Sequence, residues 1–149
     1  MRRRSALDRL LRRARSRITR LRPRAASAAI EAGARLVDIR PEFQRRADGD
    51  IPGAIVIERN HLEWRLHPAS SGRIREALDF NGRWIIICDE GFSSSLAAAT
   101  LKAIGLRDVS DVAGGFRAWR AAHLPVVKRA RPAPPRLASR TGRGSRGRA

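Results

Sequence analysis

The sequence contains one cysteine, no tyrosine and only 5% aromatic residues. One cysteine cannot form an intramolecular disulfide, which fits a reducing compartment, and we expect a cytoplasmic protein. The arginine-rich start lacks the uninterrupted apolar stretch of about 7–15 residues that a secretory signal needs. No segment approaches the roughly 20 apolar residues of a membrane span. The sequence therefore predicts neither export nor a transmembrane segment.

Acidic residues are scarce: 14 acids stand against 32 lysines and arginines, for a net charge of +18. The excess lies at the two ends. Residues 1–24 carry eleven arginines and one acid, and residues 128–149 carry eight basic residues and no acid, whereas residues 25–127 are neutral. A chain of 149 residues suffices for one domain with a core, which we place in the neutral middle.

We divide the chain into a basic N-terminal segment (1–16), a folded domain (17–127) and a basic tail (128–149). The tail should be disordered, because its Arg, Pro, Gly, Ala and Ser bury little apolar surface. Near the N-terminus, apolar residues recur at spacings of three and four, which is typical of a short basic amphipathic helix: Leu7, Leu10, Leu11, Ala14, Ile18 and Leu21. We favour a helix laid against the domain or frayed in solvent over one bound to a membrane surface, RNA or an acidic protein. Any nucleic acid should bind the tails only, in a salt-sensitive way.

Within the middle, short β-type runs alternate with helical patterns, which indicates an α/β layer fold. We expect strands at 17–21, 36–39, 53–57, 84–88 and 109–112. We expect helices at 23–33, from Pro41, and at 61–66, 71–78, 94–104 and 116–122. Asn60 and Glu63 have the spacing of a capping box for the third of these. Trp84 to Cys88 is apolar at successive positions, so it is the candidate central parallel strand. Trp84 and Trp119 are expected in the core.

Cys88 stands at the end of that strand, and five residues separate it from the helix predicted at 94–104. Backbone N–H groups converge where a strand turns into a helix, and such a cluster binds anions and favours a thiolate. Cys88 is therefore a candidate nucleophile. The alternative is a small buried apolar residue, because free cysteine is commonly buried.

The chain resembles the rhodanese-like domain family from about Ile18 to Val127. Four segments carry the resemblance in order and spacing: Leu36-Val37-Asp38-Ile39-Arg40, Asp50-Ile51-Pro52-Gly53-Ala54-Ile55, the loop that begins at Cys88, and Gly114-Gly115-Phe116-Arg117-Ala118-Trp119. The resemblance implies a three-layer α/β fold, in which helices flank a mostly parallel five-stranded sheet. It also implies that Cys88 accepts a sulfane sulfur as a persulfide and passes it to a thiophilic acceptor.

The loop from Cys88 to Ser93 has six residues before Ser94. It resembles the loop of the family's sulfurtransferases rather than the seven-residue loop of its phosphatases, which also ends in an arginine. Members that use thiosulfate often carry basic residues in this loop, where the chain has Asp89 and Glu90. Their negative charge opposes thiolate formation and the approach of a dianion, so thiosulfate is a doubtful substrate.

The remaining loop residues have more ordinary alternatives. Gly91 should supply a backbone conformation that other residues resist. Phe92 is expected to line the pocket or to pack beneath the loop. Ser93, Ser94 and Ser95 could donate hydroxyls to a bound sulfur species or cap the following helix, and Ser93 is the favoured donor.

Five residues outside the loop are supporting candidates. Asp38 and Arg40 more readily form a structural ion pair than take part in the chemistry, although the resemblance gives them a role in supporting the loop. Arg59, Trp64 and Arg65 fall in a segment that in this family can face the active site. They would either recognise an acceptor there or be a solvated and packed surface.

No metal and no cofactor is expected, because His61, His67 and His123 lack metal-ligand spacing with one another and with Cys88. Without a second cysteine, turnover requires a sulfur donor and an external thiol, cyanide or protein as acceptor. The acidic loop leaves a second function open, a non-catalytic protein-interaction module. The basic tails leave a third, association with nucleic acid. We favour a monomer.

Overall fold

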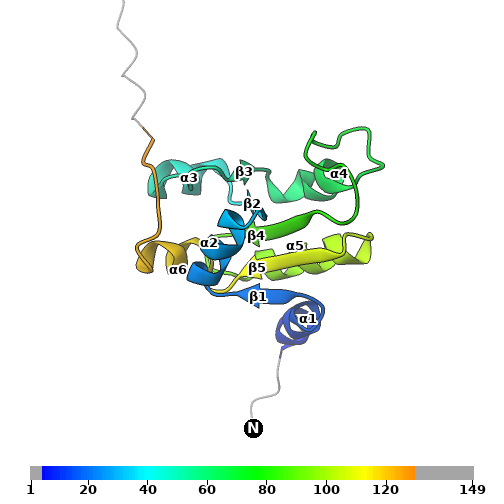
Figure 1. Ribbon diagram of the computed structural model, residues 1–149. Coiled ribbons are helices and arrows are strands. Elements are labelled where there is room, and N and C mark those ends of the chain that lie inside the picture. Colours follow the sequence, from blue (N-terminus) through cyan, green and yellow to red (C-terminus); the bar gives the residue numbers. More distant parts are fainter. Residues whose placement is uncertain (1–4, 130–149) are drawn as a thin grey trace, which may run out of the picture.

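The computed structural model describes residues 5–129. Its sheet is entirely parallel and has the order β1-β5-β4-β2-β3 (Figure 1). The strands are β1 (Thr19–Leu21), β2 (Arg35–Asp38), β3 (Ile55–Val56), β4 (Arg83–Ile87) and β5 (Asp108–Val112). Ile85, Ile86 and Ile87 of the central strand are fully buried. The predicted α/β fold with a mostly parallel five-stranded sheet is confirmed.

Helices cover both faces of this sheet. They are α1 (Ala6–Arg15), α2 (Pro23–Glu31), α3 (Glu42–Asp48), α4 (Leu62–Leu66), α5 (Ser93–Ala103) and α6 (Gly115–Ala121). Figure 1 shows α2, α3 and α6 on one side and α1, α4 and α5 on the other. Each face has its own apolar cluster, because successive residues of β4 point to opposite faces. Trp84 and Ile86 belong to one cluster, and Ile85, Ile87 and Trp119 to the other.

The predicted capping box of Asn60 and Glu63 is wrong. A 3-10 turn, η1 (Arg59–His61), precedes α4, so His61 becomes the residue before the helix and makes no side-chain cap. The Glu63 carboxylate instead accepts a hydrogen bond from Arg59 Nη1 at 2.5 Å. The capping pattern failed because the 3-10 turn takes up Asn60 and shifts the start of the helix by one residue.

The helix predicted at 71–78 is also wrong, because this segment forms separate tight turns. The N–H of Ile74 donates to the carbonyl of Arg65 at 2.9 Å, and Ile74 packs on the core beside the fully buried Ala77. The Ile74 N–H is thus bonded to a residue outside the segment. Gly72 lowers helix propensity further, so tertiary contacts decide the conformation.

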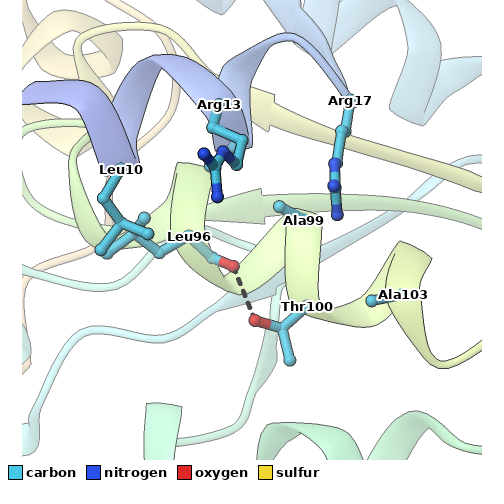
Figure 2. A pocket seen from close by; sticks show the side chains of 8 residues that line it. Leu10, Arg13, Arg17, Leu96, Ala99, Thr100 and Ala103 are labelled. Carbon is cyan, nitrogen blue, oxygen red and sulfur yellow. Dashed lines mark hydrogen bonds between the residues drawn. The ribbon is translucent and has the colours of Figure 1, made fainter.

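The N-terminal helix α1 packs against α5 (Figure 2). A capping box of Ser5 and Asp8 begins α1. Leu10 and the buried Ala14 face Leu96 and Ala99 of α5, and an apolar groove of about 310 Å³ remains between the helices. The domain limits drawn from charge remain predictions. The basic tail lies, from residue 130 onward, outside the described residues.

Burial predicts where this fold is sensitive to substitution. Ile86→Ala should lower the free energy of unfolding by about 2–5 kcal/mol, because it opens a cavity in the central strand. Val56→Ala in the edge strand β3, where Val56 is 44% exposed, should cost about 1 kcal/mol or less. Urea denaturation of both variants measures the difference. Equal losses would contradict the central position of β4.

Candidate functional site

Cys88 directly follows β4 and lies at a pocket of about 300 Å³. Its Sγ accepts hydrogen bonds from the backbone N–H groups of Gly91 at 3.2 Å and Ser94 at 3.3 Å. The pocket is lined by Ile39, Arg40, Pro41, Gln44, Cys88, Asp89, Glu90, Phe92 and Ser93. Because N–H donors aimed at sulfur stabilise its anionic form, this geometry suits a thiolate.

The loop places its other residues in distinct surroundings. Gly91 has φ +86°, in the left-handed region that favours glycine. Phe92 is half exposed and lines the pocket, and the Arg15 guanidinium lies 5.7 Å from its ring centroid. Ser93 is exposed and, of the three serines, is the one that lines the pocket.

Ser94 and Ser95 are fully buried and bind Asp111 of β5. Their hydroxyls donate to Asp111 Oδ2 at 2.9 and 2.7 Å. The residue before α5 is Phe92, and it makes no side-chain cap. The predicted alternative of a serine cap is therefore wrong, because α5 begins at Ser93 and all three serines lie within the helix rather than before it.

Two arginines that the sequence reasoning missed hold the loop from behind. Arg15 Nη2 of α1 and Arg20 Nη2 of β1 both donate to the carbonyl of Gly91, each at 2.9 Å. Arg20 also pairs with Asp111 through Nε at 2.9 Å. Burial, followed by repulsion from Arg20, lowers the pKa of Arg15. Nothing in the sequence pairs these residues, because 71 and more positions separate the arginines from the loop.

The start of α6 clamps the loop from another side. The N–H of Phe116 donates to the carbonyl of Cys88 at 2.8 Å, and the N–H of Arg117 donates to the carbonyl of Asp89 at 3.1 Å. Gly115 makes this approach possible: its φ is +61°, and a Cβ there would lie 2.6 Å from both carbonyl oxygens. The paired glycines therefore let a helix terminus sit against the loop backbone.

The two acidic loop residues share one cation. Arg117 Nε lies 2.9 Å from the Asp89 carboxylate and 3.6 Å from that of Glu90. The hydrogen bond that Arg117 donates to the Asp89 carboxylate raises the pKa of Arg117. The Asp89 side chain is 14% exposed and that of Glu90 57% exposed. Most of the unbalanced negative charge at the pocket mouth therefore belongs to Glu90.

Asp38 and Arg40 form a buried ion pair, with Arg40 Nη2 at 2.7 Å from Asp38 Oδ2. The same nitrogen donates to the carbonyl of Gly49 at 2.9 Å, and the guanidinium lies 3.8 Å from the ring centroid of Phe116. Arg40 also lines the Cys88 pocket. The pair thus joins β2 to the wall of the site and to α6.

The three residues predicted for acceptor recognition do not line the Cys88 pocket. Arg59 pairs with Glu63, and Arg65 Nη1 donates to the carbonyl of Gly72 at 3.2 Å. Trp64 is exposed and lines a separate pocket. Within residues 5–129, no cluster of three or more His, Cys, Asp or Glu could hold a metal ion, and no helix is long and apolar enough to cross a membrane.

The parallel sheet and the cysteine loop define a class of domain that sequence comparison also identifies. The chain belongs to the rhodanese-like domain family, because the model of that family matches residues 22–122.

Two curated relatives are named thiosulfate sulfurtransferase GlpE. The one from Pseudomonas syringae pv. syringae is 36% identical over 101 residues, which are 68% of this chain and 86% of the relative. The one from Pseudomonas putida is 40% identical over 91 residues, which are 61% of this chain and 74% of the relative.

Two solved structures share the fold. A protein of unknown function from Rhodopseudomonas palustris, RPA3614, described as a possible tyrosine phosphatase, is 31% identical with a TM-score of 0.75. The alignment covers 85% of this chain and 99% of that protein. The polysulfide-sulfur transferase homodimer from Wolinella succinogenes is 22% identical with a TM-score of 0.64, over 80% of this chain and 85% of its own, which supports the fold alone.

Because α6 packs closely on the loop, alanine substitutions at two glycines should lower the free energy of unfolding by different amounts. Gly53 and Gly115 both have positive φ, but a Cβ at Gly53 would meet nothing within 4 Å. Gly53→Ala should therefore lose about 1–2 kcal/mol of unfolding free energy from backbone strain alone. Gly115→Ala should lose at least about 1 kcal/mol more, because it adds a clash with two carbonyls. Thermal or urea unfolding measures both variants. Equal losses would show that the loop yields to the methyl group.

Proposed function

We propose that the protein is a sulfurtransferase that carries sulfane sulfur as a persulfide on Cys88. The observation that carries the proposal is the Cys88 Sγ at a pocket, with the N–H groups of Gly91 and Ser94 directed at it. Membership of the family and the names of its GlpE relatives support the same activity.

In the first step, the Cys88 thiolate attacks the sulfane sulfur of a donor. A new S–S bond forms, the donor's bond to that sulfur breaks, and the donor leaves with the electron pair. In the second step, an external thiolate, cyanide or protein acceptor attacks the outer sulfur, and the Cys88 thiolate leaves. The two steps conserve atoms and electrons, so they need no metal, cofactor or oxidant.

The loop backbone could hold the outer sulfur of the persulfide. Within residues 5–129, the N–H groups of Phe92 and Ser93 have no hydrogen-bond acceptor, and both residues line the pocket. Donors fixed before the reaction stabilise an anion without a cost of reorganisation. Successive backbone N–H groups of this kind form a nest that binds small anions, and the outer sulfur of the persulfide would occupy that position.

Transfer must end on another molecule, because the chain has only one cysteine. We place the protein in the cytoplasm, where reducing thiols that can accept the sulfur are maintained. Arg59, Trp64 and Arg65 are not proposed as part of the catalytic pocket. The alternative of a non-catalytic interaction module is an outcome of the first experiment below.

Exposure to sulfane-sulfur donors should add the mass of one sulfur atom to the folded protein, as measured by intact-mass spectrometry. The Cys88→Ala variant should gain none, and addition of cyanide or a thiol should remove the sulfur from the wild type. Failure of every donor to load the wild type, with Cys88 still open to alkylation, would favour the interaction module.

Charge at the pocket mouth should limit thiosulfate as a donor, and Glu90 should dominate because Arg117 balances Asp89. Glu90→Lys should raise kcat/KM for thiosulfate about tenfold, which corresponds to about 1.4 kcal/mol. It should change the rate with a neutral organic trisulfide much less. Added salt should shrink the gain, because ions screen exposed charges.

Glu58→Lys is the matched control, because Glu58 is exposed and lines a pocket separate from that of Cys88. It changes the net charge by the same amount and should leave both donors unaffected. An equal gain in both variants would assign the effect to net charge rather than to Glu90. Rapid thiosulfate turnover by the wild type, unchanged by Glu90→Lys, would show that Glu90 does not oppose the donor.

A further inference from the structure

The contacts behind the active loop come from a part of the chain that precedes the family match. Arg15 and Arg20 both lie before residue 22, where the match begins. Arg15 Nη2 donates to the carbonyl of Gly91 and its Nε donates to the hydroxyl of Ser95 at 3.1 Å. Arg20 donates to the same Gly91 carbonyl from the edge strand β1.

We propose that Arg15 of α1 and Arg20 of β1 are positioning residues of the Cys88 site. The N-terminal helix α1 would then be required for full reactivity of Cys88. The proposal deepens the proposed function and rests on the thiolate chemistry of Cys88. Neither arginine lines the Cys88 pocket. Both act through the loop backbone and through their charge.

The first effect is on backbone direction. The described chain contains no cis peptide bond, and in a planar trans peptide the carbonyl and the following N–H point in opposite directions. Two guanidinium groups hold the Gly91 carbonyl behind the loop, so the N–H of Phe92 faces away from them. The glycine N–H itself donates to Cys88 Sγ. The arginines therefore fix the orientation of the peptide that follows this donor.

The second effect is electrostatic. One carboxylate, Asp111, lies near both arginines. It is fully buried, accepts a hydrogen bond from Arg20 and accepts the two serine hydroxyls, and it attracts Arg15 through its charge. Two cations and one anion leave one positive charge beneath the loop. An uncompensated cation close to a thiol favours the thiolate and equally favours a persulfide anion. This charge opposes the negative charge of Glu90 at the mouth.

Asp111 does not require Arg15 as a partner, because Arg20 already forms its ion pair. Partial burial and repulsion from Arg20 lower the pKa of Arg15, whereas attraction to Asp111 and Cys88 raises it. The Arg15 side chain instead contacts the loop and the start of α5, through the Gly91 carbonyl and the Ser95 hydroxyl.

Arg15→Ala in the full chain tests the proposal. Removing Arg20 would instead leave the buried carboxylate of Asp111 unpaired and destabilise the fold. The probe is iodoacetamide, whose rate of alkylation of Cys88 is followed by intact mass. Because iodoacetamide is neutral and needs no sulfur donor, the rate reports the thiolate and not the transfer reaction.

Arg15→Ala should lower the alkylation rate about tenfold at neutral pH, and guanidinium ion at millimolar concentration should restore part of it. Arg13→Ala is the matched control, because Arg13 lies on the same helix and faces the α1–α5 groove instead of the loop (Figure 2). The control should alkylate at the wild-type rate with or without guanidinium. Circular dichroism should show both variants folded.

An unchanged rate in Arg15→Ala would overturn the proposal, as would an equal loss in Arg13→Ala or a loss that guanidinium leaves untouched. Failure of the proposed function is distinguishable. If the wild type accepts no sulfur but Arg15→Ala still slows alkylation in a guanidinium-dependent way, Arg15 positions a reactive thiol whose reaction is not sulfur transfer.

Discussion

The buried carboxylate of Asp111 organises the reactive loop. Asp111 ends up fully buried on β5, where an unpaired carboxylate would be very unfavourable. Its oxygens are satisfied by Arg20, Ser94 and Ser95. Since Ser94 and Ser95 lie in the first turn of α5, the carboxylate ties the start of this helix to the sheet. The N–H of Ser94, which donates to Cys88 Sγ, is thereby fixed in direction.

The same loop is held by backbone contacts on its opposite side. Gly115 allows the N–H groups of Phe116 and Arg117 to bind the carbonyls of Cys88 and Asp89. Carbonyls that point toward α6 leave the loop's N–H groups free to face sulfur. The anion-binding character of the site therefore depends on a close helix approach, on a buried carboxylate and on the Gly91 conformation, and no single side chain creates it.

The sequence could predict the fold and the position of Cys88 at the end of the central strand, because both rest on local signals. Four successive apolar residues before Cys88 predicted the central strand, and the change to a helical pattern predicted the loop. The capping box at Asn60 failed because a 3-10 turn with an Arg59–Glu63 pair takes its place. The helix at 71–78 failed because Ile74 bonds to Arg65 and packs on the core. Local propensity does not contain these contacts.

Arg15, Arg20 and Asp111 escaped sequence reasoning for a different reason. Their charges were visible, but Arg15 fell in the basic N-terminal segment (1–16), and Arg20 fell in an expected strand whose neighbour was not predicted. Only the parallel pairing of β1 with β5 sets Arg20 beside Asp111, and only the packing of α1 on α5 brings Arg15 to the loop. A count of charge by segment cannot detect such a pairing, because the partners lie in different segments.

The charges around Cys88 therefore differ in sign between the solvent side of the loop and the side that faces Arg15 and Arg20. Glu90 places a negative charge at the solvent side, where water and salt screen it. Arg15 and Arg20 place a positive excess behind the loop, where screening is weaker because the groups are partly buried. A deep cation stabilises sulfur anions once formed, whereas a shallow anion acts mainly on the approach of charged donors. Under the proposed function, the two charges would govern different steps: the deep cation the stability of the carried sulfur, and the shallow anion the choice of donor.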